Sequence, residues 1–471
     1  MKSVKKIIVI TLLLIVYIGS SKVIDTERYQ LTKKIPNDIK ESIKKYLYPY
    51  KLIQENEVTI ANNKKNNISK VNTIQIKDKL IEKLAIENEI NLKKAKSDLF
   101  FEKTKEKKVN LFNKNYVLKI YSSKVNQITK GQNNFYPGSA YLDFYNDKLF
   151  LLSATGILGF SNKIENDIIF KQIKNNIDHF INEKHFKKKF YFSVKDLKII
   201  KNKIYISFSN ELKEDCWNTS IIVADLNFEE VIFKKLFEPI ECSHSLNNTD
   251  NEFGGGQAGG RIVKLNEENI LFSSGDYRNR KFAQDSKSVI GKIIQVNINN
   301  GDYKIISIGH RNPQGLFYNK KKKYIISTEH GPMGGDEINL IRINYEKIPN
   351  YGWPIASYGE HYGGKNAKKN ISKYKKYPLY KSHKDHDFIE PIKYFDPAIG
   401  ISEIVYLEKN KYIASSMKDK SIHMFEINKN DEVENLIRVE IGERIRDIIF
   451  NGKDIFLFLE DTASVGIINY N

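Results

Sequence analysis

Short hydrophobic runs separated by polar turns characterise the chain from about residue 118 onward. A unit of strand, tight polar turn and strand first occurs at residues 141–152, where Asn146, Asp147 and Lys148 separate two such runs. Further copies begin at residues 197, 262, 316, 404 and 448. Repeated short strands of this kind are typical of β-propeller blades, which hide most sheet edges by radial closure. Six copies predict an all-β, six-bladed β-propeller, whereas a β-sandwich, the alternative fold, would not explain six similar hairpins.

The segment before the propeller has a different pattern. Hydrophobic residues recur at three- and four-residue spacings in 39–43 and 80–86, which indicates helices. Lysine, asparagine and glutamate are frequent, and such charges are typical of solvated helix faces. We therefore expect a small Lys-rich helical extension over residues 25–115, followed by the propeller over residues 116–471.

The first residues have the layout of an export signal. Lysines within the first six residues precede a hydrophobic run over 7–18, and small residues follow at 19–21. The run is short for a membrane-spanning helix, which needs about 20 residues, although residues 23 and 24 could extend it. We expect residues 1–24 to be a signal peptide or an N-terminal membrane anchor, and the protein to be periplasmic or extracellular.

Composition narrows the class of protein. Of 471 residues, 41% are hydrophobic and 28% are charged, which excludes a disordered chain and a multi-span membrane protein. The net charge is +19, but residues 1–115 alone carry 25 basic and 13 acidic residues. No basic helix is interleaved with aromatic residues, so we expect no nucleic-acid binding.

The chain has two cysteines, Cys216 and Cys242. In an exported protein a single pair is most simply one disulfide, and two buried free thiols are the alternative. The surrounding residues lack the spacing of a zinc site.

Several segments carry side chains that suit chemistry. Gly309–Leu316 places a guanidinium group, an imidazole and two amides at the start of a strand. Glu329–Asn339 contains a Gly-Pro step and Gly-Gly-Asp-Glu, a tight loop whose oxygens suit Ca²⁺. Lys418, Arg444 and Arg446 add three cations, and the two arginines would point the same way on a strand. Each segment alone has an ordinary structural explanation, but together they predict a pocket for a polyanionic ligand at the propeller axis.

Three motifs carry a family resemblance. Gly309–Leu316, Glu329–Ile341 and Asn350–Pro354 resemble the soluble, calcium-dependent pyrroloquinoline quinone (PQQ) sugar dehydrogenases, the glucose/sorbosone dehydrogenase family of six-bladed propellers. The similarity covers roughly residues 120–471 and does not reach the first 110. It implies an oxidoreductase with PQQ and Ca²⁺ that oxidises an aldose or a related hydroxyl substrate by hydride transfer to the quinone. Electrons would then pass to a separate acceptor.

The resemblance also implies roles for individual residues. A Ca²⁺ ion and a guanidinium group beside the quinone oxygens would stabilise the charge that develops during hydride transfer. The positions that match are Arg311, Asn312 and Gln314 at the quinone edge, Lys418, Arg444 and Arg446 at the PQQ carboxylates and oxygens, the carbonyls of Gly331 and Pro332 at the cofactor's Ca²⁺, and Glu337 and Tyr351 around a second, structural calcium.

One position departs from the family. Family enzymes have a histidine that takes the proton of the sugar hydroxyl, and Gln257 occupies its place here, while the supporting acid is retained as Asp276. An amide cannot accept that proton near neutral pH. Three accounts stay open: Asp276 acts as the base, directly or through a water; His244 moves in as the base; or the chain does not turn over sugar. In the last case it would be a non-catalytic propeller that binds a glycan or a protein partner.

Overall fold

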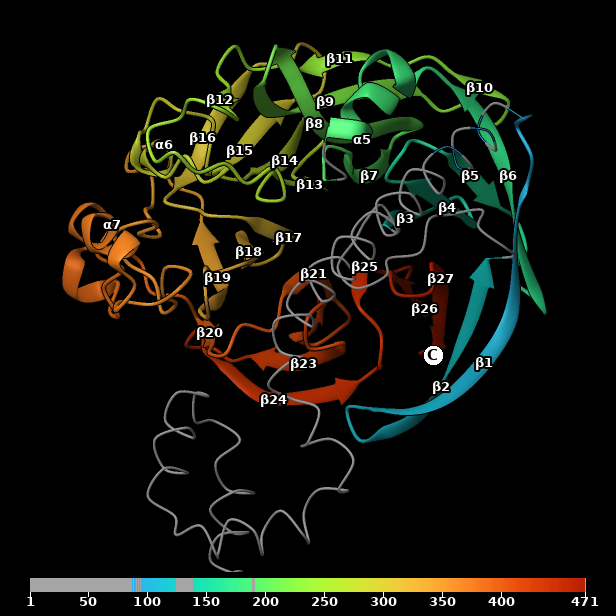
Figure 1. Ribbon diagram of the computed structural model, residues 1–471. Helices are drawn as coiled ribbons and strands as arrows, with labels where there is room; N and C mark the ends of the chain where they lie inside the picture. Colours follow the sequence, from blue (N-terminus) through green and yellow to red (C-terminus); the bar gives the residue numbers. More distant parts are fainter. Residues whose placement is uncertain are drawn as a thin grey trace, which may run out of the picture. The chain divides into compact units, whose positions relative to one another are not determined.

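Six blades, each built on four antiparallel strands, surround a common axis (Figure 1), and one further strand joins the first and last blades into a single ten-stranded sheet. The computed structural model describes residues 95–123, 139–188 and 191–470, with alternate residues between 87 and 93. The predicted six-bladed β-propeller is confirmed. From the axis outward, the first blade consists of β3 (Ala140–Tyr145), β4 (Lys148–Ser153), β5 (Leu158–Ser161) and β6 (Asp167–Asn175), and the second of β7 (Val194–Ile200), β8 (Lys203–Lys213), β9 (Cys216–Asp225) and β11 (Lys234–Phe237). The third blade consists of β13 (Gly259–Lys264), β14 (Asn269–Ser274), β15 (Lys292–Asn297) and β16 (Tyr303–Ile308), and the fourth of β17 (Pro313–Asn319), β18 (Tyr324–Glu329), β19 (Asp336–Arg342) and β20 (Lys393–Phe395). The fifth blade consists of β21 (Ile401–Tyr406), β22 (Lys411–Ser416), β23 (Ser421–Ile427) and β24 (Val433–Glu440), and the sixth of β25 (Ile445–Phe450), β26 (Asp454–Leu459), β27 (Ser464–Asn469) and β2 (Lys114–Ser123).

The six hairpins predicted from the sequence are the two innermost strands of the six blades. The turns of these hairpins explain why the hairpins can be predicted from the sequence. Asn146 and Asp147 have φ values of 49° and 58°, and Lys409 and Asn410 have φ values of 45° and 67°. Two-residue turns with positive φ match the twist of the flanking strands, and asparagine and aspartate tolerate that conformation well.

Strand β2 closes the ring, because it pairs with β27 although it lies more than 300 residues earlier. Strand β1 (Leu99–Leu111) then joins β2 to β6, the outer strand of the first blade. We expected the helical extension to reach residue 115, and the structure has a strand at residues 99–111. The buried residues at both ends of β1 alternate with exposed ones, and this period of two indicates a strand.

Short elements complete the described structure: two-residue strands β10 (Glu230–Val231) and β12 (Ser243–His244), helices α5 (Glu183–Lys188), α6 (Lys281–Gln284) and α7 (Ile371–Lys376), and 3₁₀ helices η2 (Ile177–His179), η3 (Lys368–Asn370) and η4 (Lys384–His386). None of the helices within the described ranges is long and apolar enough to span a membrane. The expected signal or anchor over residues 1–24, and the helices expected in 39–43 and 80–86, lie outside the described residues.

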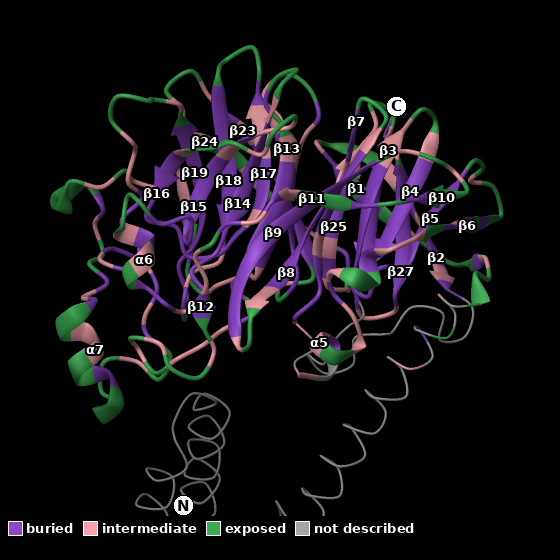
Figure 2. Cartoon of the chain, turned by 90° about the horizontal axis from the view of Figure 1, so that it is seen from above, coloured by how far each residue is buried: buried purple, intermediate pink, exposed green. Residues whose placement is uncertain are grey.

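The strands are largely buried between neighbouring blades, while the connecting loops are exposed (Figure 2). Carboxylates on inner strands link one blade to the next: Asp143 accepts from the backbone of Ile199 (2.6 Å) and Asp196 from that of Ile262 (2.7 Å). Buried Arg261 lies at the centre of this network. It forms ion pairs with Asp196, Glu403 and Asp447, on the inner strands of three other blades. These contacts fix the inner strands whose ends carry the site.

Candidate active site

A pocket of about 190 Å³ lies at the propeller axis, between residues of several inner strands and the loops that join them. We call it the axial pocket. Tyr141 on β3, Lys195 on β7, Gln314 on β17 and Arg446 on β25 face it from four different blades. Its lining residues include Ser139, Tyr141, Tyr191, Ser193, Lys195, Asn312, Gln314, His330, Met417, Arg444 and Arg446.

One buried carboxylate holds both arginines of the axial pocket. Nε of Arg444 donates to Glu460 Oε2 at 3.0 Å, and Nε of Arg446 donates to Glu460 Oε1 at 2.5 Å. Ser139 also donates to Glu460. Glu460 follows β26 and is completely buried, so it presents the two guanidinium groups to the pocket in fixed positions. The sequence did not single out Glu460, since an acid next to a strand end has no distinguishing pattern.

Lys195 is a further cation of the axial pocket that sequence reasoning missed. Its ammonium group donates to the carbonyl of Tyr191 (2.5 Å) and the hydroxyl of Ser193 (3.4 Å), and it forms no ion pair with a described residue. Burial, reinforced by the charge of Arg446, lowers the pKa of Lys195 to about 7. Nearby, Nε2 of His330 is buried and has no hydrogen-bond partner in the described part of the chain. Both groups are suited to an anionic ligand that the pocket would enclose.

The structure brings Gln257, Asp276 and Arg311 together in one hydrogen-bonded chain. With its amide oriented to satisfy its neighbours, Gln257 donates to Asp276 Oδ1 at 2.8 Å and accepts from Arg311 Nη2 at 2.8 Å. Its oxygen also accepts from Nε of Arg278 at 3.0 Å. Arg278 lies two residues after Asp276, and sequence reasoning did not select it.

The arrangement does not favour Asp276 as a direct base. Asp276 is completely buried, and it accepts from the indole N–H of Trp353 and from the backbone N–H of Arg278, both at 2.8 Å. Burial raises the pKa of Asp276, while the charges of Arg311 and Arg280 oppose that rise. Its oxygens are thus occupied by neighbours that hold the carboxylate in place.

His244 is not near the site cavities. It lies on β12, its side chain is exposed, and it lines neither the axial pocket nor the smaller cavities around Arg311. The structure therefore does not support His244 as the base in this conformation.

Arg311 is held from both ends. Its backbone N–H donates to Glu329, which also contacts Nδ1 of His310 at 2.8 Å. Its guanidinium group donates to the carbonyl of His330 at 2.8 Å and lies over the ring of Trp353, 5.4 Å from the centroid. These contacts fix a positive charge next to His330 and Asn312, which line the axial pocket.

The structure brings several of the predicted cofactor-binding residues together in the axial pocket, but it does not place all of them there. Asn312 accepts from Gln314 at 3.0 Å, and Gln314 in turn accepts from Arg446 at 3.3 Å, so these three lie side by side in the axial pocket. Lys418 is exposed and is not part of the lining, where its neighbour Met417 lies instead.

The predicted metal ligands lie in a tight turn beside Arg311. The carbonyls of Gly331 and Pro332 accept no hydrogen bond from the described residues, while the backbone N–H of Gly331 donates to Asp336 at 3.0 Å. A Cβ on Gly331 would collide with the carbonyl oxygens of Gly334 and Gly335, so the turn requires glycine there. These two free carbonyls provide the oxygen ligands that a hard cation prefers.

Glu337 and Tyr351 line a small cavity of about 10 Å³ behind this turn. Burial, together with the charge of Glu329, raises the pKa of Glu337 well above its usual value. The phenol of Tyr351 donates to the carbonyl of Leu340 at 2.6 Å. Within the described residues, no group of three or more His, Cys, Asp or Glu side chains is arranged to hold a metal ion. The second calcium stays a prediction.

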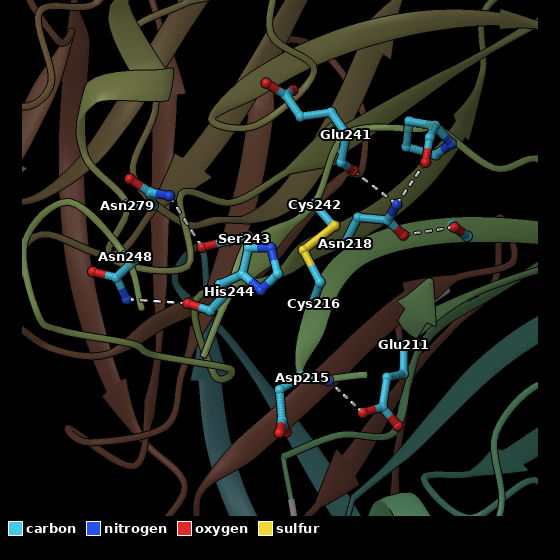
Figure 3. The surroundings of a disulfide bond; sticks show 12 residues. Glu211, Asp215, Cys216, Asn218, Glu241, Cys242, Ser243, His244, Asn248 and Asn279 are labelled. Atoms are coloured by element: carbon cyan, nitrogen blue, oxygen red, sulfur yellow. Dashed lines mark hydrogen bonds between the residues drawn. A yellow bond between two sulfur atoms is a disulfide. The ribbon is translucent and has the colours of Figure 1, made fainter. Parts of the chain in front are cut away.

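A disulfide fixes one wall of the site. Cys216 on β9 is bonded to Cys242 just before β12, as the simplest interpretation of the sequence predicts (Figure 3). Asn218 donates to the carbonyls of Pro239 (2.7 Å) and Glu241 (2.9 Å), which holds the returning segment against β9. Ser243 then accepts from Asn279 at 3.3 Å (Figure 3), so the cross-linked segment supports the loop that carries Arg278.

The fold and the site together define a class: a six-bladed propeller with a cationic pocket at its axis and a hydrogen-bonded Gln–Asp–Arg chain beside it. The chain belongs to the glucose/sorbosone dehydrogenase family, because the family model described as Glucose / Sorbosone dehydrogenase matches residues 200–469.

The individual relatives have low sequence identity to this chain, and each alignment covers only part of it. Aldose sugar dehydrogenase YliI of Escherichia coli is 28% identical over 240 residues, which are 46% of this chain and 59% of that protein. The chain spans about half to three fifths of the length of two curated relatives that it matches.

Solved structures share the fold. The soluble aldose sugar dehydrogenase from Escherichia coli in the apo form has a TM-score of 0.54 at 20% identity, covering 70% of this chain and 95% of that one. The PQQ-bound form of aldose sugar dehydrogenase from Streptomyces coelicolor has a TM-score of 0.53 at 16% identity, covering 75% of this chain and 97% of that one.

Proposed function

We propose that the protein is a PQQ- and Ca²⁺-dependent dehydrogenase that oxidises an aldose or a related hydroxyl substrate. The observation that carries this proposal is the axial pocket, a single cavity that Lys195, Arg444 and Arg446 line together. The printed names of the relatives support it, since one is an aldose sugar dehydrogenase and one solved relative is a PQQ-bound form. A non-catalytic propeller is not favoured by membership of a dehydrogenase family.

The residues of the axial pocket fit PQQ, which carries three carboxylates. Arg444 and Arg446 are positioned by Glu460 to bind carboxylates, for which the planar guanidinium group is well suited. Lys195 offers a buried ammonium group without a carboxylate partner among the described residues. Gln314 and Asn312 add amide groups at the same wall.

Bound PQQ would supply the quinone that accepts a hydride, which the protein's own side chains cannot do. Arg311 would then stabilise negative charge on an oxygen at the edge of the pocket, because its guanidinium group is already held by His330 and Gln257. The carbonyls of Gly331 and Pro332 would hold the Ca²⁺ beside it.

Gln257 has a binding role in this proposal. It uses one amide hydrogen on Asp276, and the other is left to orient a substrate hydroxyl. The hydroxyl proton would leave to solvent, because neither Gln257 nor the fully engaged Asp276 is placed to take it. The substrate would lose a hydride and a proton, so an aldose would give a lactone.

The export of the protein remains part of the proposal. The disulfide supports an oxidising compartment, since such bonds persist outside the cytosol. We propose that the protein acts in the periplasm or outside the cell, held by an N-terminal anchor or released by cleavage, and that it passes electrons to a separate acceptor.

The test is a titration of purified, chelator-treated protein with PQQ in the presence and absence of Ca²⁺, followed by aldoses while the quinone absorbance is recorded. We expect saturable, Ca²⁺-dependent binding and bleaching by at least one sugar. The variant Arg444→Gln/Arg446→Gln should lose binding at least tenfold. Arg438→Gln, an exposed arginine on β24, is the matched control.

The results of this titration distinguish a dehydrogenase from a protein that binds the cofactor without turnover and from one that does not bind it. Binding with bleaching supports the dehydrogenase, and binding without bleaching by any aldose would overturn the catalytic part while keeping the cofactor site. An absence of PQQ binding with and without Ca²⁺ would overturn the proposal as a whole.

A further inference from the structure

A second cavity of about 110 Å³ is lined by Arg311, which does not line the axial pocket. We call it the cationic cleft. It shares none of its lining residues with the axial pocket, but Arg311 in the cleft is followed directly by Asn312, which lines the axial pocket. The charged groups that line it are Arg278, Arg280, Arg311, Lys369, Lys373 and Glu252.

Part of this charge is balanced within the protein. Arg280 pairs with Glu252 at 2.7 Å and with Asp250 at 3.4 Å, and Lys373 pairs with Glu252 as well. These pairs hold the pKa of Glu252 down at about 2, so Glu252 stays ionised as a structural counter-ion.

The other cations are only partly balanced. Neither Arg278 nor Arg311 forms an ion pair with a described residue, and their shared partner is the neutral amide oxygen of Gln257. Asp276 is the carboxylate nearest to this pair in the chain of contacts, and the charge of Arg311 opposes the rise in its pKa. Two guanidinium groups that converge on one oxygen repel each other, and Lys369 adds a third positive charge at the rim. A bound anion would offset this repulsion.

Arg278 and Arg311 are held rigidly. Arg278 lies over the ring of Tyr362, 5.3 Å from the centroid, and the hydroxyl of Tyr362 is 3.5 Å from Arg311. The loop of Arg278 is supported by the contact between Asn279 and Ser243, next to the disulfide (Figure 3). A site that is organised before its ligand arrives loses less entropy on binding.

The cleft also contains an unpaired hydrogen-bond acceptor. Nε2 of His361 lies 2.9 Å from the carbonyl of Tyr377, to which it donates, so Nδ1 carries a lone pair. That Nδ1 atom is buried and has no partner among the described residues, and His361 is only 2% exposed. A ligand hydroxyl would satisfy it.

We propose that the cationic cleft binds the acidic group of the substrate, so that the protein prefers an aldose carrying a carboxylate or phosphate over a neutral one. This inference rests on the proposed dehydrogenase function. Arg278 and Lys369 bind the anionic group, and His361 accepts a hydrogen bond from a neighbouring sugar hydroxyl. A cavity of this size has room for a carboxylate and a water, since a water occupies about 30 Å³ of the liquid.

The first test compares D-glucuronate, D-glucose 6-phosphate and D-glucose as substrates of the PQQ- and Ca²⁺-loaded protein. We expect kcat/KM for at least one acidic sugar to exceed that for glucose about 10- to 100-fold, the range of one charge-assisted hydrogen bond. The two acidic sugars distinguish a carboxylate site from a phosphate site. Equal or higher kcat/KM for glucose would overturn the inference.

Variants of lining residues test whether the preference for acidic sugars arises in the cationic cleft. Arg278→Gln and Lys369→Gln should both reduce kcat/KM for the acidic sugar about tenfold, and Lys369→Gln should leave that for glucose within about twofold. Lys369 is exposed, so that variant tests the cleft even if Arg278→Gln fails to fold. Lys375→Gln, an exposed lysine on α7 outside the lining, is the matched control. An unchanged preference in both cleft variants would contradict the proposal.

A binding measurement separates this inference from the dehydrogenase function. Calorimetric titration of the PQQ-free protein with D-glucuronate and D-glucose 6-phosphate needs no turnover. Binding that Arg278→Gln or Lys369→Gln weakens would support the cleft even if no sugar were oxidised. Oxidation of glucose, without binding or preference for either acidic sugar, would overturn the cleft and leave the dehydrogenase standing.

Discussion

The amide nitrogen of Gln257 donates to Asp276 Oδ1 at 2.8 Å, at the position where the resemblance in sequence leads us to expect a catalytic base. The pair forms one hydrogen bond between an amide and a carboxylate, and the amide cannot accept a proton near neutral pH. Because the amide oxygen also accepts from Arg278 and Arg311, Gln257 links Asp276 to two arginines of the cationic cleft.

Replacing Gln257 with histidine should restore a base. Asp276 is already placed to accept from an imidazole N–H, so the Gln257→His variant should oxidise its substrate about 100-fold faster, at the lower end of the range for general base catalysis. The measurement is the rate of quinone reduction between pH 5 and 9. The wild-type rate should rise steadily with pH, and the variant should reach a plateau above the pKa of the new histidine. Gln257→Asn is the control, and a variant slower than wild type at every pH would contradict the prediction.

Glu460 should matter for both stability and cofactor binding. Its carboxylate pairs with Arg444 and Arg446 in a fully buried position. Breaking a buried pair leaves uncompensated charge, so Glu460→Gln should lower the free energy of unfolding by about 3 kcal/mol or more. Misplaced arginines should also weaken PQQ binding at least tenfold. Urea unfolding and PQQ titration test this, with Glu268→Gln at an exposed position as control; equal values for both variants would argue against it.

PQQ affinity should depend on pH through Lys195. Burial depresses the pKa of Lys195 to about 7, so the lysine is charged below that pH and becomes neutral above it. An anionic ligand favours the charged form, and affinity should therefore fall as pH rises from 7 to 9, by up to about tenfold per unit. In Lys195→Met this decline should disappear, whereas the exposed Lys321→Met should retain it. The prediction fails if wild type and Lys195→Met have the same slope.

Removing the disulfide should destabilise the protein and loosen the site. A cross-link between residues 26 positions apart contributes about 3 kcal/mol by constraining the unfolded chain. In the Cys216→Ser/Cys242→Ser variant, the free energy of unfolding measured with urea should fall by that amount. It should also no longer change when reductant is added. Because Ser243 supports the loop of Arg278, the variant should also bind acidic sugars more weakly. Reductant should reproduce both effects in the wild type; wild-type stability in the variant would show that the bond contributes nothing.

The inner part of the propeller could be predicted from sequence because its signals are local. Each inner hairpin has a short turn of two to four residues, such as Asn146–Asp147 between β3 and β4, two strands that are mostly buried. Strand β1 could not be predicted in the same way. Its centre, Glu102–Lys108, is charged and exposed, and only the pairing with β2 and β6 makes it a strand.

The candidate site likewise contains some residues that could be predicted from the sequence and others that could not. Gln257, Asp276 and Arg311 were selected from family motifs, and the structure places them in contact. Lys195 and Glu460 were missed because their importance comes from burial beside residues distant in sequence, and no local pattern reports burial of a single lysine or glutamate. Lys418 was selected from its motif, but its side chain is exposed.

Closure by β2 orders the events of biosynthesis. The last blade contains β25, β26 and β27 from the end of the described chain, and its outer strand comes from residues 114–123. During translation β2 is made first and must wait for β27, so the ring cannot close until nearly the whole chain has been synthesised. A protein shortened before Ser464 would leave the edge of β2 unpaired and prone to self-association, even though every residue of the axial pocket were present.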